Sequence, residues 1–190
     1  MHNESEVAVL RLGHRPGRDN RMTTHVGLTA RALGADRVVL DGASGPAETV
    51  EDITERFGGP FEVEVTESPK GVLRNWDGVV VHLTMYGERV QDVEGEIREA
   101  RADEPLLVVV GSEKVPFDVY EHADYNVAVT NQPHSEVAGL AVFLDRLFDG
   151  RELDREWADP DAVVLPEDTG KRVVDPEDAP DGRLTDLDDA

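Results

Sequence analysis

The sequence contains no cysteine, and lysine occurs only three times in its 190 residues. The absence of cysteine excludes disulfides, cysteine-ligated zinc and thiol catalysis. Aromatic residues make up only 5% of the chain, and no apolar run approaches the roughly 20 residues that span a bilayer. We therefore expect a soluble protein with no membrane partner. Since no secretory signal pattern is present, a cytoplasmic location is expected.

Positive charge is scarce. The chain carries 41 acidic residues against 19 lysines and arginines, which gives a net charge of −22. The 39% hydrophobic content, arranged in well-spaced runs, argues against disorder for most of the chain. An acidic, lysine-poor surface is typical of a halophilic protein, because in about 1 M salt the Debye length falls to about 3 Å and self-repulsion is screened. The charge thus indicates a habitat and not a function.

One segment departs from this acidic character. Residues 11–37 hold six arginines and only two acidic residues. Such clustering indicates an anionic partner, and phosphate is the simplest choice. The alternative is that some of these arginines only pair with surface carboxylates. The arginines are Arg11, Arg15, Arg18, Arg21, Arg31 and Arg37.

Short apolar runs alternate with helical patterns along the first three quarters of the chain. Several runs are apolar throughout, as expected for strands that are covered on both faces. The pattern predicts strands at residues 7–12, 37–40, 61–65, 78–83, 105–110 and 125–129. It predicts helices at residues 23–33, 46–57, 88–101 and 135–148, the first with Thr23 or Thr24 as N-cap.

This alternation predicts an α/β fold with a largely parallel sheet flanked by helices. The pattern ends near residue 152, where Asp and Pro dominate the sequence. We therefore expect a domain at residues 1–150, followed by an acidic tail at 151–190 that is extended or disordered.

Three stretches at predicted strand ends are candidate ligand-binding loops, since open α/β sheets bind ligands beyond the carboxyl ends of their strands. They are residues 82–87, 111–116 and 130–136. Each alone could be an ordinary turn. The chain has no glycine-rich phosphate motif, no hydrolase elbow and no metal-ligand spacing, so we expect no bound metal. Backbone amides and small residues suit an uncharged or cationic ligand, such as an adenosyl group.

Four stretches together resemble the archaeal tRNA cytidine-56 2′-O-methyltransferase family of the SPOUT superfamily of trefoil-knotted methyltransferases. The likeness covers about residues 7–150 and rests on the segments "LRLGHRPGRDNRMTTHVGLTARALGA", "VHLTMYG", "VVVGSEKVP" and "YEHADYNVAVTNQPHSEVAGLAVFLDRL". It implies a deep trefoil knot in the C-terminal part of the sheet, a homodimer, and methylation of a ribose 2′-hydroxyl in the T-loop of tRNA.

The resemblance also implies that S-adenosyl-L-methionine binds in the knot. Gly111 would let the backbone approach this cofactor closely. The residues implied in cofactor binding are Leu83, Gly111, Ser112, Glu113, Lys114, Val115, Val129, Thr130, Asn131, Gln132, Pro133, His134, Ser135 and Glu136.

The catalytic arginine is harder to assign from the resemblance. Many ribose methyltransferases of this superfamily carry an arginine six residues before a glycine of the first helix, where this chain has Leu28. Their Ser-Leu-Asn segment is also absent. Arg15, Arg21 and Arg31 are the candidates, with Arg15 and Arg21 preferred because we expect them in the loop. An arginine is a poor base, so His14 or His25 is the easier proton acceptor.

Two other functions stay open from the residues alone. The chain could be a non-catalytic RNA-binding or assembly protein that keeps the fold, or a small-molecule enzyme of flavodoxin-like architecture. The retained cofactor stretches disfavour the first, and the basic N-terminal segment disfavours the second.

Overall fold

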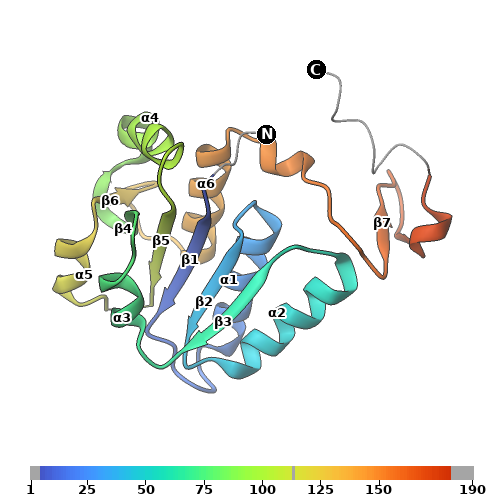
Figure 1. The fold of residues 1–190 in the computed structure, drawn as a ribbon, viewed down its shortest axis with the longest axis horizontal. Coiled ribbons are helices and arrows are strands. Elements are labelled where there is room, and N and C mark those ends of the chain that lie inside the picture. The colour runs from blue at the N-terminus through green and yellow to red at the C-terminus, as the bar shows by residue number, and fades with distance from the viewer. Residues whose placement is uncertain (1–4, 113, 181–190) are drawn as a thin grey trace.

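The computed structural model describes residues 5–112 and 114–180. A six-stranded parallel sheet forms its centre, with strand order β3-β2-β1-β5-β4-β6 (Figure 1). The predicted α/β fold with a parallel sheet is therefore confirmed. The strands are β1 (Val7–Leu12), β2 (Arg37–Asp41), β3 (Glu62–Thr66), β4 (Val79–Arg89), β5 (Leu106–Gly111) and β6 (Tyr125–Ala128).

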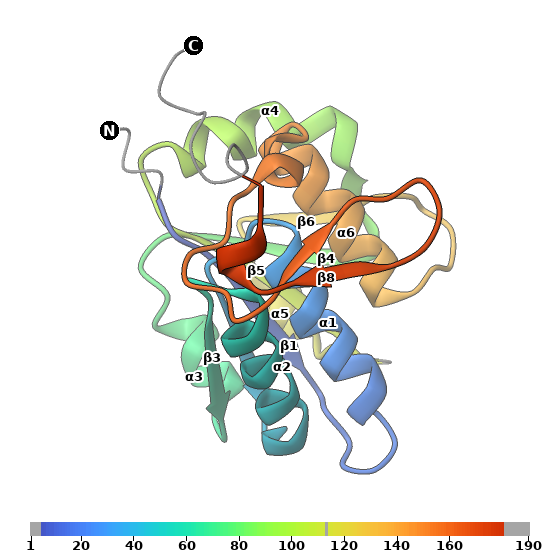
Figure 2. The ribbon, with the colours of Figure 1, turned by 90° about the vertical axis from the view of Figure 1, so that its right-hand side faces the viewer.

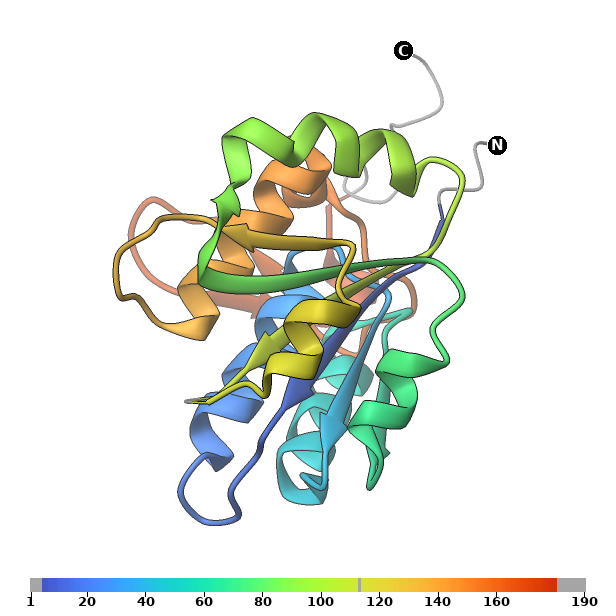
Figure 3. The ribbon, with the colours of Figure 1, turned by 90° about the vertical axis from the view of Figure 1, so that its left-hand side faces the viewer.

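The helices cover both faces of the sheet and are α1 (Asn20–Ala32), α2 (Ser44–Phe57), α3 (Pro69–Arg74), α4 (Val90–Arg101), α5 (Phe117–His122) and α6 (Glu136–Phe148). Four of them, α1, α2, α4 and α6, pack on one face with the larger core (Figure 2). The short helices α3 and α5 lie on the other face (Figure 3). None of the described helices is long and apolar enough to cross a membrane.

The central strands are buried along their whole length, which explains their continuous apolar sequences. In β1, Val7 and Val9 point to the larger core, while Ala8, Leu10 and Leu12 point to the smaller one. Every residue of β1 and β5 is buried. The carboxyl ends of these two adjacent strands therefore meet at one edge of the sheet.

The observed helices differ from the prediction in two ways. Helix α1 begins at Asn20, so the expected N-cap at Thr23 or Thr24 is wrong. Thr23 is fully buried and its hydroxyl bonds to His14 Nδ1 at 2.8 Å, so it does not cap the helix. The short helices α3 and α5 are absent from the prediction, because six residues are too few to show a helical apolar period.

Beyond α6 the described chain contains a 3-10 helix, η1 (Arg151–Asp154), a two-stranded antiparallel ribbon, and a second 3-10 turn, η2 (Pro176–Asp178). The ribbon consists of β7 (Val163–Leu165) and β8 (Arg172–Val174). Residue Ala158 pairs with Gly59 through two backbone hydrogen bonds of 2.8 and 2.9 Å. None of these elements is among those predicted, and the domain boundary at residue 150 stays a prediction.

Candidate functional site

A cavity of about 390 Å³ lies where β4, β5 and β6 meet the start of α6. This volume falls within the range of small-molecule binding sites. Its walls combine apolar side chains with hydroxyl, imidazole and carboxylate groups. The lining residues are His82, Leu83, Thr84, Met85, Tyr86, Val110, Gly111, Ser112, Val115, Tyr120, Val127, Val129, Pro133, His134, Ser135, Glu136 and Gly139.

Nine of the fourteen predicted cofactor residues line this cavity: Leu83, Gly111, Ser112, Val115, Val129, Pro133, His134, Ser135 and Glu136. Lys114, Thr130, Asn131 and Gln132 lie in the same two loops but are not in its walls. Glu113 lies outside the described residues. The three candidate loops thus converge on one space, although their individual roles stay a prediction.

The wall formed by β4 is an outward bulge. The pairing of β4 with β6 shifts between Leu83 and Glu88, which both lie opposite Val127. The intervening residues, Thr84 to Gly87, leave the ladder and three of them face the cavity. The Asn131 side chain holds this bulge, because its amide donates to the carbonyl oxygens of Met85 and Gly87 at 2.8 and 3.1 Å. Asn131 therefore shapes the cavity without lining it.

The first turn of α6 forms the opposite wall. Ser135 caps this helix, since its hydroxyl oxygen accepts a hydrogen bond of 3.2 Å from the Ala138 amide. His134 Nδ1 lies 2.8 Å from the Gln132 carbonyl oxygen, so Nδ1 carries the proton and donates. Glu136 follows the cap and places a carboxylate at the cavity wall.

His82 lines the cavity and is the first residue of the candidate loop at residues 82–87. It is fully buried, and its Nδ1 lies 2.9 Å from Asn126 Oδ1. The Asn126 amide donates to the Tyr120 carbonyl oxygen at 2.9 Å, which fixes its oxygen toward His82. Nδ1 therefore carries the proton. Burial lowers the pKa of His82 more than the hydrogen bond to Asn126 raises it, and this favours the neutral ring.

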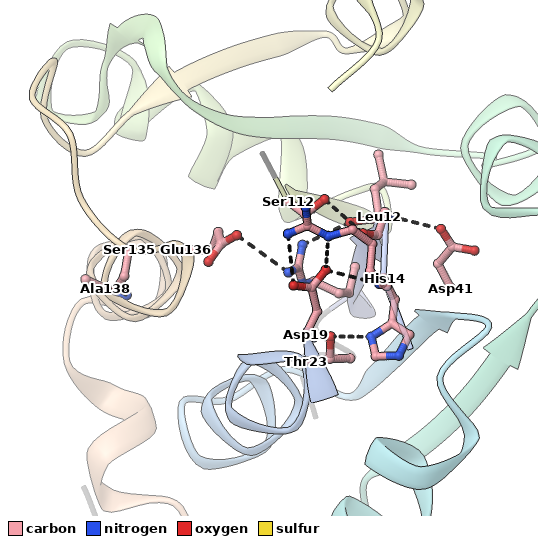
Figure 4. A network of polar contacts seen from close by, with 12 residues as sticks. Leu12, His14, Asp19, Thr23, Asp41, Ser112, Ser135, Glu136 and Ala138 are labelled. Carbon is pink, nitrogen blue, oxygen red and sulfur yellow. Dashed lines mark hydrogen bonds and ion pairs between the residues drawn. The ribbon is translucent and has the colours of Figure 1, made fainter. Parts of the chain in front are cut away.

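The loop after β1 lies beside the loop after β5, which borders the cavity (Figure 4). The Gly13 amide donates to Asp41 Oδ2 at 2.9 Å, and the Gly13 carbonyl oxygen accepts from the Ser112 hydroxyl at 2.9 Å. His14 follows, anchored through Nδ1 on Thr23. Gly13 adopts a positive φ of 75°, a conformation that favours glycine.

Arg15 is held by Asp19 in a two-pronged ion pair. Its Nε and Nη2 atoms lie 2.8 and 3.0 Å from the two carboxylate oxygens. The Arg15 side chain keeps 39% of its surface exposed. Hydrogen bonds from Arg15 lower the pKa of Asp19 to about 2. The carboxylate thus stays ionised and fixes the guanidinium.

Arg21 does not lie in the loop as expected. It is an exposed residue in the first turn of α1, because the helix begins three residues earlier than predicted. In addition, fewer arginines of the segment 11–37 are available to bind an anionic partner than its sequence indicated. Arg11 and Arg31 are buried, and Arg37 pairs with Glu6 and Glu64 at 2.6 and 3.4 Å. The alternative reading, pairing with surface carboxylates, therefore holds for Arg37.

Arg11 is the residue of this region that sequence reasoning passed over as a site residue. It is only 1% exposed, and its Nη2 lies 3.5 Å from Glu136 Oε1. The signal was present: a single charged residue interrupts a strand whose other residues are all apolar. Such a charge, in a strand covered on both faces, must have a partner.

The charged and imidazole side chains of the site do not form a metal centre. In the described ranges, 5–112 and 114–180, no three histidine, aspartate or glutamate residues are grouped as metal ligands. The cavity instead offers neutral acceptors, one carboxylate and backbone loops. Such a set can hold an organic cation with a heterocycle. The neighbouring loop at residues 13–19, which carries Arg15 and Arg18 and is called the arginine loop below, can hold an anion.

Comparison with protein families gives a match to the family described as tRNA ribose 2′-O-methyltransferase, aTrm56, over residues 57–174. The tRNA (cytidine(56)-2′-O)-methyltransferase of Natronomonas pharaonis is 74% identical over 174 residues, which cover 91% of this chain and 97% of that protein. The enzyme of the same name from Haloarcula marismortui is 72% identical, covering 93% of this chain and 99% of its own. The likeness therefore extends beyond residues 7–150.

Solved structures share the fold at low sequence identity. The SpoU methyltransferase AviRb from Streptomyces viridochromogenes, in complex with AdoMet, has a TM-score of 0.53 and 16% identity, covering 78% of this chain and 58% of that one. An RNA 2′-O ribose methyltransferase has a TM-score of 0.54 and 18% identity, covering 78% of this chain and 57% of its own. This chain thus spans a little over half the length of these two structures.

Proposed function

Because the chain belongs to the aTrm56 family of tRNA ribose 2′-O-methyltransferases, we propose that it methylates the 2′-oxygen of cytidine 56 in tRNA. The observation that carries this proposal is the 74% identity, over 97% of its length, to the enzyme of that name from Natronomonas pharaonis. The conjunction of the cavity with a neighbouring arginine loop supports it, because the reaction needs a methyl donor beside a polyanionic acceptor.

The methyl donor in this proposal is S-adenosyl-L-methionine, bound in the cavity. The residues present fit it. Gly111 and Gly139 line the cavity, and a Cβ at either position would meet the side chain of Val115 or His134, so these glycines let the two side chains stay in the cavity wall. The Glu136 carboxylate suits a cationic ligand. When bound, this cofactor supplies an activated methyl group on sulfur and a good leaving group.

The protein's main contribution is then alignment of the two reactants. We assign Arg15 to the phosphate beside the reacting ribose or to the 2′-oxygen as negative charge develops there, since Asp19 fixes its guanidinium. His14 is the assigned proton acceptor, because imidazole exchanges protons near neutral pH. Arg21 is exposed in the first turn of α1 and is assigned to a phosphate contact.

The partners and surroundings follow from the same reaction. A cytoplasmic location is proposed because the substrate is tRNA. The protein's net charge of −22 suits a cytoplasm of high salt concentration. A homodimer and a trefoil knot in the C-terminal part of the sheet are proposed from the family resemblance. Tyr86 and Phe117 are 76% and 72% exposed; Tyr86 lines the cavity and Phe117 stacks on the lining residue Tyr120, and a dimer would cover this apolar surface.

The experiment that tests this function is methyl transfer to defined tRNA. The purified protein is incubated, in KCl at about 1 M so that its self-repulsion is screened, with tritiated S-adenosyl-L-methionine and an unmodified transcript. The label is then mapped. A matched transcript with 2′-deoxycytidine at position 56 is the control, because it lacks only the accepting oxygen.

Label on the 2′-oxygen of cytidine 56, absent from the deoxy control, is the expected result. Label at another nucleotide would overturn the substrate assignment. Cofactor binding without any transfer would favour the alternative, a non-catalytic RNA-binding or assembly protein.

A further inference from the structure

Arg11 is a charged residue in the interior of the sheet. It sits in β1 between its neighbours β2 and β5, opposite Leu40 and Val110. Side chains alternate along a strand, so Arg11 points to the same face as Val7 and Val9. That face is covered by α1 and α6. A cation is thus enclosed between these two helices at the carboxyl end of the central strand.

The contacts of Arg11 lead to both halves of the proposed site. Its Nη1 donates to the Leu12 carbonyl oxygen at 2.9 Å, and its Nη2 lies 3.5 Å from Glu136 Oε1. Glu136 lines the cavity and keeps 28% of its side chain exposed. Among the residues that the structure describes, the Arg11 Nε has no hydrogen-bond partner. The guanidinium is therefore held by the Leu12 carbonyl oxygen through one terminal nitrogen and directed toward Glu136 by the other.

A second carboxylate faces Arg11 from the arginine loop. Asp19 is only 8% exposed, and attraction between the two charges contributes to the lowered pKa of Asp19 and opposes the loss of charge on Arg11. Asp19 also holds Arg15. Arg11 thus interacts with two carboxylates: that of Asp19, which fixes the arginine loop, and that of Glu136, which lies in the cavity wall.

Packing alone does not explain an arginine at this position. Enclosing a guanidinium is costly, and replacing a whole buried ion pair by apolar side chains of similar volume is often neutral or stabilising, although removing one partner alone destabilises the fold. Resting on the proposed function, we propose that Arg11 is a positioning residue: it fixes Glu136 at the cavity wall and, through Asp19, ties the arginine loop to the cofactor cavity. Arg11 acts through these two carboxylates and does not touch the reacting atoms.

The test compares Arg11→Met with Arg101→Met. Arg101, at the end of α4, is a matched control, because it is also a buried arginine, 8% exposed, whose guanidinium lies 4.6 Å from the ring centre of Phe148 on α6. The dissociation constant of S-adenosylhomocysteine is measured by calorimetry and the unfolding midpoint by a thermal melt, both in molar KCl. We expect both variants to lower the midpoint, while only Arg11→Met weakens binding, by about tenfold.

A double-mutant cycle isolates the contact with Glu136. Glu136→Gln is expected to weaken binding to a similar extent as Arg11→Met, and the double variant no further than either single one, because both remove the same interaction. Arg11→Lys keeps the charge but lacks the planar fork, so it should weaken binding by a smaller factor. This conservative variant replaces Arg11→Met if the methionine variant does not fold.

The outcomes separate this inference from the proposed function. Wild-type protein that binds no S-adenosylhomocysteine and transfers no methyl group would end the proposed function. Wild-type protein that does both, with Arg11 variants that bind as tightly as Arg101→Met, would overturn the positioning role alone. Strictly additive effects of Arg11→Met and Glu136→Gln would overturn it too.

Discussion

The hydroxyl of Ser112 donates a hydrogen bond of 2.9 Å to the carbonyl oxygen of Gly13, residues that lie 99 positions apart in the chain. The Ser112 amide also donates to the Leu12 carbonyl oxygen at 3.2 Å. The loop that borders the cavity is thereby joined to the loop that carries His14 and Arg15. In the proposed reaction these two loops hold the methyl donor and the acceptor, so their fixed separation bears directly on rate.

Replacing Gly13 should disturb this junction more than replacing Gly17. Both residues have a positive φ, 75° and 76°, so Gly→Ala costs on the order of 1–2 kcal/mol of stability at either position. Only at Gly13 would the new Cβ meet a neighbour, the Ser112 hydroxyl oxygen at 2.5 Å. We expect Gly13→Ala to lower methyl transfer well below Gly17→Ala at similar folded fraction, as measured by single-turnover kinetics. Equal activities would show that the junction does not matter.

Gly87 is expected to be essential for the bulge that walls the cavity. A Cβ there would overlap the backbone of Asn126 and Val127, which cannot move without breaking the pairing of β4 with β6. Gly87→Ala should therefore cost more than about 2 kcal/mol in the free energy of unfolding, measured with chemical denaturant.

Gly95→Ala is the matched control for Gly87. Gly95 lies in α4 with open space around the position of a Cβ, so the same substitution should stabilise the protein by about 0.5–1 kcal/mol. If both substitutions changed the free energy of unfolding only slightly, Gly87 would not be essential for the bulge.

The sequence predicts the sheet well because its central strands β1 and β5 are buried on both faces and are almost entirely apolar. β1 matches its predicted range of 7–12, and the other strands overlap theirs. The cavity loops were found because glycine, proline and polar residues follow apolar strands. The bulge in β4 was not found, since residues 82–87 look like a turn and only the pairing with β6 shows that the strand resumes.

The site residues that sequence reasoning missed are those whose role depends on a distant partner. Thr23 has the residue type of an N-cap, yet the helix starts earlier and its hydroxyl serves His14. Arg11 counted as part of a basic segment, but its side chain turns inward to Glu136, 125 positions further along the chain. Such pairings depend on which strand ends lie side by side, and the local spacing of residues does not predict the order of the strands.

Asp19 should titrate far below an ordinary aspartate. Arg15 holds its folded-state pKa at about 2, compared with an ordinary value of 3.8. A lowered pKa means that the pair stabilises the folded state above about 3.8, and that this contribution is lost as the pH falls toward 2. Carboxyl NMR titration in molar KCl would measure it. Arg15→Gln should return the pKa toward 3.8, and a pKa that stays low would exclude Arg15 as the cause.

His82 should make stability depend on pH in a higher range than Asp19 does. Burial lowers its pKa in the folded state, so the unfolded chain takes up a proton first as the pH falls through about 6.5. Stability is then lost as the pH decreases below that value, until the folded-state pKa is reached. We expect His82→Gln to flatten this part of a melting-temperature profile. A variant that keeps the full wild-type slope would assign the pH dependence to other groups.

The affinity for tRNA should depend less on salt concentration than is usual for RNA-binding proteins. Of the arginines in residues 11–37, only Arg15, Arg18 and Arg21 extend from the loop and the first turn of α1 toward solvent, and the whole chain carries a charge of −22. Each phosphate contact contributes about 0.7–0.9 to the slope of log affinity against log salt, so a slope of about −2 to −3 is expected.

Fluorescence anisotropy with labelled tRNA, from moderate to molar KCl, would measure this slope. Arg21→Gln should make it shallower by about 1, because one phosphate contact is lost. Arg98→Gln is the control, since Arg98 on α4 donates to the Arg146 carbonyl oxygen, far from the loop. A slope steeper than about −6 would require more phosphate contacts than these arginines provide, and would place the tRNA on another surface. A shallow slope that Arg21→Gln leaves unchanged would remove Arg21 from the interface while leaving recognition to unstacked bases and 2′-hydroxyl contacts.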